Sequence, residues 1–453
     1  MSHNWSTVLA VVAVLIVGAL AGPAGAAVAG TASASTVQQS ADSYVVEQGE
    51  FCEPIEPLSS SGSVEAFYDY RDHDTHPDGV DRMYSSYGTE HLQESDTSLL
   101  FLHQGTDGTS LVMVHDELEG DTAGGVVTFE MAGVPHDAEW VVRNDDYDGD
   151  TNRDEFETGD GWASADWAYI QNRTGGGALN GGFDDEFAVT IHPGFNEDAN
   201  LYDAEVDEEF DDENRTGYGG DWWDGGDIED WEVLSGDAED PDRGSIPSMD
   251  EPVTIRTGTC DGPSVTYERT DDGITVTIDD VRADDTVSLQ PTRGTHDGVR
   301  FERLETTGLA DDTTLTFEND RPSGVSAGDL EGSEALSTVT VTGDDPSQGS
   351  SSTVTFSVDS SELDELGIDP DEIALYEVDD DGAWNVSTTE VRADQGGSYQ
   401  YDAEVDSLEA LAVGPHPDAG SVDASPLAGF EVGLTVAIVV LIALFLGTRA
   451  RRR

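Results

Sequence analysis

The sequence predicts a mostly β protein with two successive β-rich regions, the second a β-sandwich of immunoglobulin-like type, and one C-terminal transmembrane helix. Three observations predict this class. Apolar and polar residues alternate with a period of two, and Asp-Gly and Gly-Gly pairs separate the short apolar runs. The last apolar run is long enough to span a bilayer and is followed by arginines. The first two features are typical of antiparallel sheets packed as sandwiches.

The composition is strongly acidic. The 453 residues include 96 Asp and Glu against 19 basic residues, all of them Arg, for a net charge of −77. A chain of this charge repels nucleic acid and anionic lipid, so we expect no nucleic-acid partner. Disorder is one interpretation, but 36% hydrophobic residues and 8 Trp favour folded cores. In molar salt the Debye length falls to about 3 Å and removes the self-repulsion. The pattern resembles proteins of halophilic archaea.

The N-terminus carries a candidate export signal. An apolar run over 8–20 has the length of a signal-peptide core and is short for a membrane span. Candidate cleavage sites end at Ala26 and at Ala34. We expect a signal peptide over 1–34 and a polar linker over 35–43. The alternative is an uncleaved N-terminal anchor.

Two β regions are expected between the ends of the chain. The first is a β-rich ectodomain over 44–262, and the second is a β-sandwich region over 263–414, interrupted by a turn-rich connection at 343–352. The expected strands include 111–114, 126–129, 140–142, 274–278, 339–341 and 354–358. One short helix is expected, with Ser361 as its N-cap, a capping box to Asp364, Leu363 and Leu366 on one face, and Gly367 at its end.

The C-terminus reads as a stalk over 415–426, a transmembrane segment over 427–448 and a basic tail over 449–453. The positive-inside rule leaves the tail in the cytoplasm and the body outside, so we expect a single-pass cell-membrane protein. The segment resembles the PGF-CTERM sorting signal of haloarchaeal surface proteins, with Ala428-Gly429-Phe430 where that family has Pro-Gly-Phe. The resemblance implies processing by an archaeosortase, and the alternative is a permanent anchor.

A second resemblance covers roughly 299–414. A strand near 354–358 is followed by Leu375-Tyr376, Trp384, Thr388-Thr389 and a closing run over 408–414. This order, directly before the sorting signal, resembles the PGF-pre-PGF domain of archaeal surface proteins. The resemblance implies display at the cell surface and no catalytic chemistry.

Cysteines and glycosylation sequons fit an exported chain. The only two cysteines, Cys52 and Cys260, permit a disulfide that would join the start of the first region to its end, the alternative being two buried thiols. Sequons begin at Asn172, Asn214 and Asn385 and are candidate glycosylation sites.

One acidic stretch has the spacing of a calcium-binding loop. Oxygen ligands alternate, Gly149 supplies a turn, and a Glu can close the site with two oxygens. The candidate ligands are Asn144, Asp146, Asp148, Asp150, Asn152 and Glu155. The preceding residues look like a strand, so we expect a calcium loop inserted in a β-domain. The alternative is a solvated acidic loop.

The remaining candidates are aromatic and imidazole side chains. Six of the eight tryptophans and seven of the ten histidines lie in the first region. Trp222 and Trp223 stand close to carboxylates, as in sugar-stacking and glycosidase sites, although tryptophans more commonly supply core. The tightest histidine cluster, with His73 and His76, lacks a recognisable zinc-binding pattern.

These observations predict a membrane-anchored surface protein of a halophile with a structural or adhesive role, braced by Ca²⁺. Its expected partners are the membrane through the C-terminal anchor, and envelope proteins or glycans. We expect no enzyme and no catalytic residues. Two alternatives remain, a surface hydrolase acting on polysaccharide and a metal- or solute-capture protein, which would need histidines of the first region to converge.

Overall fold

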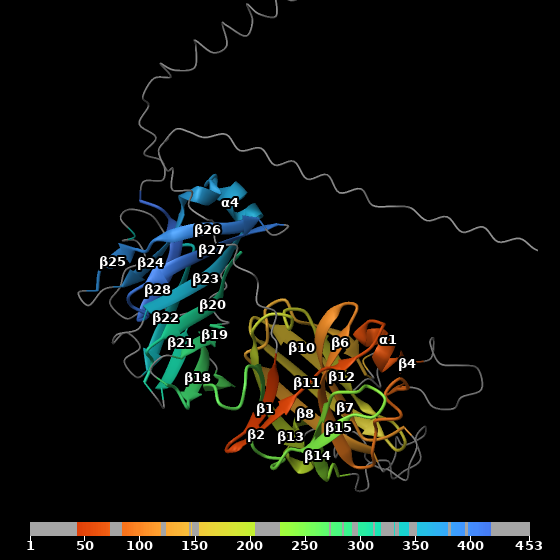
Figure 1. Ribbon diagram of the computed structural model, residues 1–453. Coiled ribbons are helices and arrows are strands. Elements are labelled where there is room, and N and C mark those ends of the chain that lie inside the picture. Colours follow the sequence, from red (N-terminus) through yellow and green to blue (C-terminus); the bar gives the residue numbers. More distant parts are fainter. Residues whose placement is uncertain are drawn as a thin grey trace, which may run out of the picture. The chain divides into compact units, whose positions relative to one another are not determined.

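The structure is a computed structural model that describes residues 43–72, 84–118, 124–144, 146, 154–203, 227–270, 273–282, 285–291, 298–310, 313–318, 330, 335–343, 351–378, 382–394 and 397–417. All of these belong to one compact unit, which begins at Ser40. The described part is mostly β, as predicted (Figure 1). The predicted signal peptide, transmembrane segment and basic tail lie outside it. In these ranges no helix combines the length and apolar character needed to cross a membrane.

Two sheets, which we call the N-terminal sheet pair, are built from residues between Tyr44 and Thr257. One sheet has the order β10-β11-β8-β13-β16-β1-β2. Its strands are β1 (Tyr44–Gln48), β2 (Phe51–Ile55), β8 (Gly124–Ala132), β10 (Glu155–Gly159), β11 (Trp162–Ile170), β13 (Ala188–Phe195) and β16 (Val253–Thr257).

The second sheet of this pair has the order β15-β14-β6-β7-β12-β9, with β3 also beside β6. Its strands are β3 (Leu58–Ser59), β6 (Thr97–Gly105), β7 (Gly108–His115), β9 (Glu139–Arg143), β12 (Gly175–Asn180), β14 (Asp230–Ser235) and β15 (Asp242–Ser245). Strands β14 and β3 run parallel to β6, whereas the other described pairings in the pair are antiparallel.

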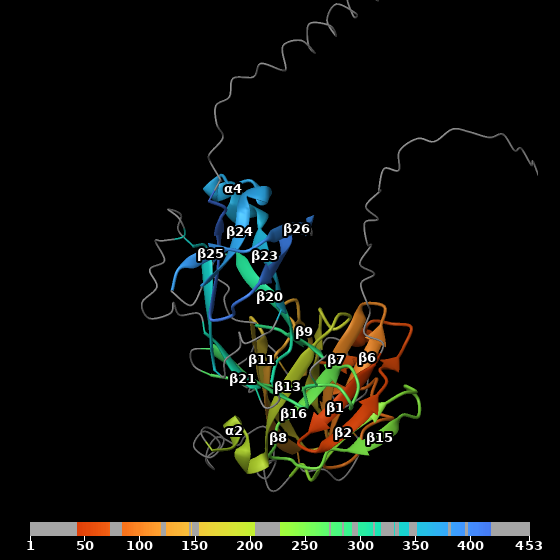
Figure 2. The same ribbon diagram turned by 60° about the vertical axis from the view of Figure 1, so that its left-hand side comes forward.

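Short elements decorate these sheets. They are α1 (Val64–Tyr68), β4 (Tyr70–Arg71), β5 (Ser85–Ser86), η1 (Asn196–Asp198) and α2 (Asn200–Asp203). Helix α1 begins at the N-cap Ser63, whose hydroxyl accepts from the N–H of Ala66. Helix α2 lies against β8 and β11 (Figure 2).

The main core of this sheet pair lies between its two sheets. Phe129 and Trp167 come from one sheet and Trp231 from the other, and all three are fully buried. A second cluster covers the opposite face of β6 and β7, where Val64 and Tyr68 of α1 pack on Phe101. Strands β6 and β7 are therefore buried on both faces, which explains their nearly continuous apolar sequence.

The C-terminal sheet pair is built from residues between Ser264 and Pro415. One sheet has the order β17-β18-β21-β22-β28-β24-β25 and the other β19-β20-β23-β27-β26. The strands are β17 (Ser264–Arg269), β18 (Gly273–Asp279), β19 (Thr286–Leu289), β20 (Val299–Thr307), β21 (Thr313–Glu318), β22 (Ser337–Gly343), β23 (Ser351–Asp359), β24 (Ile373–Val378), β25 (Trp384–Val386), β26 (Thr389–Asp394), β27 (Ser398–Val405) and β28 (Ala410–Pro415).

Alternation predicted the core of this pair. Ile274, Val276 and Ile278 of β18 are buried between the sheets with Phe356 of β23, whereas the intervening threonines are half-buried. The strands expected at 111–114, 126–129, 140–142, 274–278, 339–341 and 354–358 all lie within observed strands, β7, β8, β9, β18, β22 and β23.

The predicted helix is present with a different start. Helix α4 (Ser360–Leu366) has Asp359 as its N-cap instead of Ser361, and Gly367 ends it in the left-handed region, as predicted. Leu363 is buried but Leu366 is 48% exposed, so the expected shared apolar face was wrong. The capping box belongs instead to the following 3-10 turn η3 (Pro370–Glu372), between Asp369 and Glu372.

Candidate functional site

One end of the N-terminal sheet pair gathers connections that are far apart in the sequence. The strand register places the starts of β6, β8, β12 and β14 at this end, together with the ends of β7, β9, β11 and β13. The pairs that establish this are Ser98–His115, Gly124–Ile170, Gly175–His115, Gly177–Arg143, Phe195–Val127 and Asp230–Thr97.

We call this the loop-bearing end. At this end lie strand ends that flank four connections, namely 116–123, 144–154, 171–174 and 196–229. The residues that follow the connection 72–84 also lie at this end, because they bond to the β11–β12 turn. The N–H of Ser86 donates to Thr174 Oγ1 at 2.9 Å, and the N–H of Thr174 donates to Ser85 Oγ at 3.2 Å.

Most of the predicted site residues of the first region belong to these connections. The calcium candidates occupy 144–155, and Asn172 lies in the β11–β12 turn. Asp148, Asp150, Asn152, Asn214, Trp222, Trp223, His73 and His76 lie outside the described residues, within segments whose described flanks are at this end. Described residues as far apart in the sequence as Ser86 and Glu229 therefore lie at one end of one sheet pair.

Asn144 fastens the predicted calcium loop to the interior. It is fully buried, and its Nδ2 donates to the hydroxyl of Tyr68 at 3.1 Å and to the carbonyl of Thr174 at 2.8 Å. Its backbone N–H donates to Gly176 O at 3.1 Å. The buried Oδ1 has no hydrogen-bond partner among the described residues. The Nδ2 of this candidate ligand thus holds the loop to the interior, while its Oδ1 accepts no hydrogen bond from the described residues.

The other described calcium candidates lie at the surface. Asp146 is 3.5 Å from the guanidinium of Arg143, and Glu155 is exposed as the first residue of β10. In the described ranges, no group of three or more His, Cys, Asp or Glu side chains is arranged to hold a metal ion. Calcium binding by this loop remains a prediction, because three of its six ligands fall outside those ranges.

A run of glycines lets β12 pass close to this buried polar network. A Cβ at Gly176, where φ is +133°, would lie 2.7 Å from the Tyr68 hydroxyl and 2.3 Å from the carbonyl of Met113. A Cβ at Gly175 would lie 2.6 Å from the ring of Tyr169. The Gly-rich sequence of β12 is therefore a packing requirement at the loop-bearing end.

A buried carboxylate lies beneath the same end. Asp116 is 2% exposed and accepts hydrogen bonds from the N–H groups of Asp96 (3.1 Å) and Glu117 (2.9 Å). Burial raises the pKa of Asp116 to about 6, because the charged form loses its hydration. Asp96 and Asp116 both have positive φ, at 57° and 67°, which ordinary L residues seldom adopt. Such strain collects at functional sites and tight turns.

A serine and a histidine meet in the core near this end. His115 Nδ1 lies 2.9 Å from Ser98 Oγ, and burial lowers the pKa of His115 to about 3. The imidazole is enclosed by the rings of Phe129 and Trp167. Both members of the pair are completely buried, so the contact stabilises the core and offers no accessible nucleophile.

The other described histidines of the first region do not converge. His91 bonds to the carbonyl of Ala238, His103 to Ser60 Oγ and His192 to the carbonyl of Tyr267. His136 is 3.3 Å from the neighbouring Asp137. Each ring thus has a separate partner, which gives the metal- or solute-capture alternative no support from the described residues.

The described tryptophans of the first region act mainly as core. Trp167 and Trp231 are fully buried, and Trp140 is 6% exposed. Trp162 is half-buried beneath the guanidinium of Arg269, which lies 3.6 Å from the ring centroid. Three of these four side chains follow the core interpretation of the tryptophan-rich composition, whereas Trp162 stacks with Arg269.

Two of the three sequons are described, and their settings differ. Asn172 has a φ of 59° in the β11–β12 turn and is half-buried. Asn385 is exposed on the three-residue strand β25. Among the described residues, β25 pairs only with β24, so Asn385 lies at a sheet edge.

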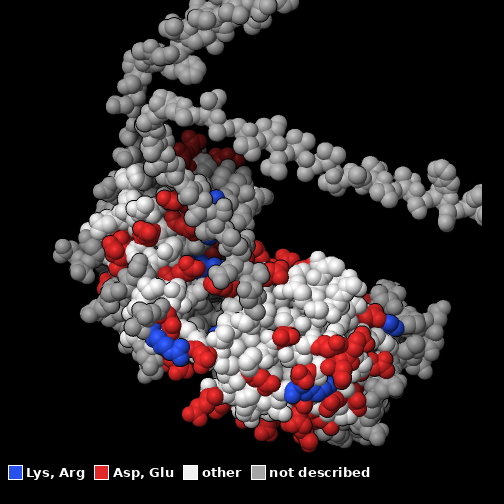
Figure 3. All heavy atoms as spheres, in the orientation of Figure 1, with Lys and Arg blue, Asp and Glu red and all other residues white. Residues whose placement is uncertain are grey.

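Among the charged side chains on the visible surface, acidic groups outnumber basic ones. Figure 3 shows Asp and Glu side chains over both sheet pairs, with few Arg side chains between them. The described arginines that flank the loop-bearing end contact tyrosine rings or carboxylates: Arg71 lies over Tyr87 at 4.3 Å, and Arg173 over Tyr84 at 5.2 Å.

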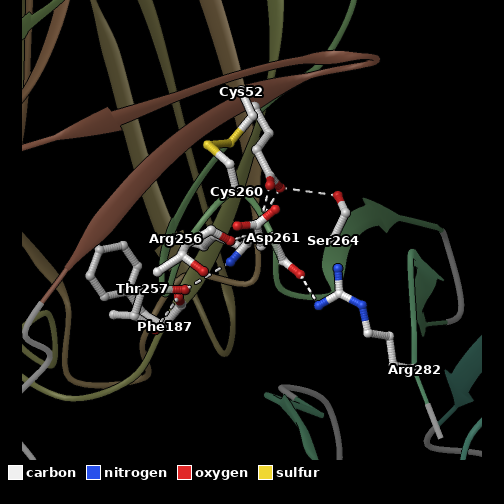
Figure 4. Close-up of polar contacts among 10 residues, drawn as sticks. Cys52, Phe187, Arg256, Thr257, Cys260, Asp261, Ser264 and Arg282 are labelled. Atoms are coloured by element: carbon white, nitrogen blue, oxygen red, sulfur yellow. Dashed lines mark hydrogen bonds and ion pairs between the residues drawn. A yellow bond between two sulfur atoms is a disulfide. The ribbon is translucent and has the colours of Figure 1, made fainter. Parts of the chain in front are cut away.

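A second polar cluster lies where the chain leaves the N-terminal sheet pair. The predicted disulfide is confirmed: Cys52 of β2 is bonded to Cys260 across a sequence separation of 208 (Figure 4). Beside it, Arg256 donates to both carboxylate oxygens of Glu47, with Nε to Oε2 at 2.9 Å. The Ser264 hydroxyl donates to the same Glu47 carboxylate at 3.0 Å.

The Arg256 guanidinium also binds the backbone of residues 257–261, which we call the exit segment. Arg256 donates to the carbonyls of Thr257 and Thr259, each at 3.1 Å, and Arg282 donates to the carbonyl of Asp261 at 2.6 Å (Figure 4). Sequence reasoning missed this cluster. The available signal was a lone Arg in the otherwise apolar and Thr-rich strand β16, in a chain with only 19 basic residues.

Comparison with known proteins adds no relative. No family model, no curated protein and no solved structure matches the chain.

Proposed function

We propose that the chain is a cell-surface protein of a halophile, anchored by its C-terminal segment, which binds an envelope protein or glycan through the loop-bearing end. The observation that carries the proposal is the gathering of the long connections of the first region at a single end. Binding residues commonly lie on loops that a rigid scaffold positions, and a β-sandwich is such a scaffold.

The chain's other features support export. A disulfide between Cys52 and Cys260 forms and persists in oxidising surroundings outside the cytoplasm. An apolar run at each end of the sequence supports a signal peptide over 1–34 and an anchor over 427–448. Acidic surfaces keep a protein hydrated and soluble where salt screens charge repulsion.

The proposal includes the finer assignments made from the sequence. The C-terminal sheet pair would be an immunoglobulin-like display module of the PGF-pre-PGF kind, followed by a stalk and a PGF-CTERM-like anchor. A calcium ion held by the 144–155 loop would brace the loop-bearing end. Asp146, Asp148, Asp150, Asn152 and Glu155 would supply its oxygens together with Oδ1 of Asn144, which accepts no hydrogen bond from the described residues.

Protease treatment of intact cells tests the location. The full chain, tagged in the 35–43 linker, would be expressed in a halophilic archaeal host, and whole cells would be digested in molar salt. We expect loss of the tag from intact cells, and release into the medium of a chain truncated after residue 426. A tag that stays protected until the cells are broken would contradict surface location.

A further inference from the structure

The two described sequons offer their acceptors in different ways. N-glycosylation joins a sugar to the Asn side-chain nitrogen within Asn-X-Ser/Thr, and the hydroxyl two residues later is part of the motif. A folded chain can be modified only where both groups can leave the surface of the fold at low cost. Hydrogen bonding and burial at the two positions determine that cost.

At Asn172 the motif is built into the fold. Thr174 is fully buried, and its Oγ1 accepts from the N–H of Ser86 at 2.9 Å and from Asn144 Nδ2 at 3.0 Å. Withdrawing Thr174 would leave two buried donors without this acceptor and would open the polar network of the loop-bearing end. This sequon is therefore closed once the N-terminal sheet pair has folded.

At Asn385 the motif lies on a strand that can open locally. Asn385 is exposed, and β25 has three residues and one described neighbour. Ser387 is buried, but its hydroxyl has no hydrogen-bond partner among the described residues. Moving that hydroxyl out breaks no hydrogen bond that it makes to the described residues. The cost lies in the backbone: the N–H of Ser387 donates to the carbonyl of Leu375 at 2.9 Å, its carbonyl accepts from Thr389 Oγ1 at 3.1 Å, and β25 pairs with β24 over three residues.

We propose that Asn385 carries an N-linked oligosaccharide and that Asn172 does not. Nδ2 of Asn385 attacks the anomeric carbon of an oligosaccharide that the host cell carries on a lipid phosphate or pyrophosphate, and the host's oligosaccharyltransferase catalyses the transfer. The C–N bond forms as the bond from that carbon to the phosphate oxygen breaks. The nitrogen loses one proton, and the lipid phosphate leaves with the bonding electrons. This inference rests on the export of the body in the proposed function.

The glycan would also protect the sheet. Strand β25 ends the order β17-β18-β21-β22-β28-β24-β25, so within the described residues its outer backbone edge has no neighbouring strand. Unpaired strand edges invite pairing with another chain, and proteins block them with charges, bulges or covering groups. A bulky hydrophilic glycan at Asn385 would block this edge on a crowded cell surface.

Mass spectrometry of the full chain from a halophilic archaeal host tests the assignment. The matched variants are Ser387→Ala, which destroys the sequon without touching Asn385, and Ser387→Thr, which keeps it. Because Ser387 Oγ makes no hydrogen bond to the described residues, we expect Ser387→Ala to melt within a few degrees of the parent. The peptide with Asn385 should carry glycan mass in the parent and in Ser387→Thr, and none in Ser387→Ala.

Two results would overturn the inference: an unmodified Asn385 when the host's own surface glycoproteins from the same cells are glycosylated, or glycan on Asn172. The protease experiment on the same cells separates this failure from failure of the proposed function. A surface-exposed chain without glycan at Asn385 refutes only the assignment, whereas a chain that stays inside refutes the surface role.

Discussion

Glu47 and Arg256 lie 209 positions apart and form a buried ion pair at the point where the chain leaves the N-terminal sheet pair. Glu47 is 8% exposed and Arg256 is 4% exposed. The same guanidinium binds two carbonyls of the exit segment, and the same carboxylate accepts the Ser264 hydroxyl. The pair thus joins the first strand of the chain to the segment that leads into β17.

Removing one member of this pair should be strongly destabilising. Arg256→Met leaves the Glu47 carboxylate buried without its counter-charge, and such losses cost about 3–5 kcal/mol. The double variant Glu47→Gln/Arg256→Met should recover much of that loss. Denaturant unfolding of the full chain at fixed molar salt measures both. As a control, Arg143→Ala removes an exposed partner of Asp146 and should cost under about 1 kcal/mol. Equal losses for the two single variants would contradict the account.

The disulfide should stabilise the protein strongly because it closes a long loop. Cys52→Ser/Cys260→Ser removes a bond across 208 positions, and the chain-entropy model gives a loss of about 5 kcal/mol. Thermal melting with and without reductant measures the effect. Reductant should lower the melting temperature of the parent and leave that of the double variant unchanged. A parent insensitive to complete reduction would contradict the prediction.

Asp116 should make the fold less stable as pH rises. Its folded-state pKa is about 6, against an ordinary value of 3.8. Between these values the folded state keeps a proton that the unfolded state has lost, so stability falls as pH rises through this window. Asp116→Asn removes the buried charge, keeps the acceptor oxygen and tolerates the positive φ. We expect a gain of about 3 kcal/mol at pH 8 and little change at pH 3.5.

Chemical unfolding at both pH values checks this prediction. A variant less stable than the parent at pH 8 would mean that the carboxylate has a partner, such as a bound cation, that offsets its burial. His115 provides a contrast of opposite sign. Its pKa is lowered to about 3 in the folded state. The unfolded state therefore takes up this proton first, and the free energy of unfolding decreases as pH falls below 6.5.

Calcium should stabilise the N-terminal sheet pair if the 144–155 loop binds it. At a hundredfold excess over the dissociation constant, binding to the native state adds about 2.7 kcal/mol. Thermal melting in molar salt, with EDTA or added calcium, should show an upward shift that Asp148→Ala/Glu155→Ala abolishes. Glu239→Ala/Asp240→Ala, in the exposed β14–β15 connection, should leave it unchanged. No shift in the parent would make 144–155 a solvated acidic loop.

Local sequence patterns predicted many of the strands but not which distant segments of the chain lie side by side. Alternation and turn residues located β7, β8, β9, β18, β22 and β23, because side-chain period and turn chemistry are properties of short segments. The parallel pairing of β14 with β6 brings Asp230 beside Thr97, and no local signal records it. The N-cap of α4 is Asp359 and not the predicted Ser361 for a related reason. Strand β23 ends at Asp359, and the helix begins at the next residue.

The candidate site was predictable in its residues and not in its geometry. The spacing of Asn144 to Glu155 is visible in the sequence, whereas the burial of Asn144 against Tyr68 and Thr174 depends on contacts 76 and 30 positions away. Buried Asp116 and the Glu47–Arg256 pair were missed because one acidic residue among 96 carries no mark of its burial.

Binding to isolated cell envelopes tests whether the loop-bearing end binds an envelope component. The exported body would be labelled and mixed with envelopes in molar salt, as the parent chain and as two loop replacements of matched type. One replaces 204–226, which follows α2 in the sequence, with a Gly-Ser linker, and the other replaces the 236–241 connection between β14 and β15. We expect the parent chain to bind saturably. The affinity should fall at least tenfold in the first replacement and stay unchanged in the second, with both variants folded. Equal binding by the parent and the first replacement would contradict this expectation.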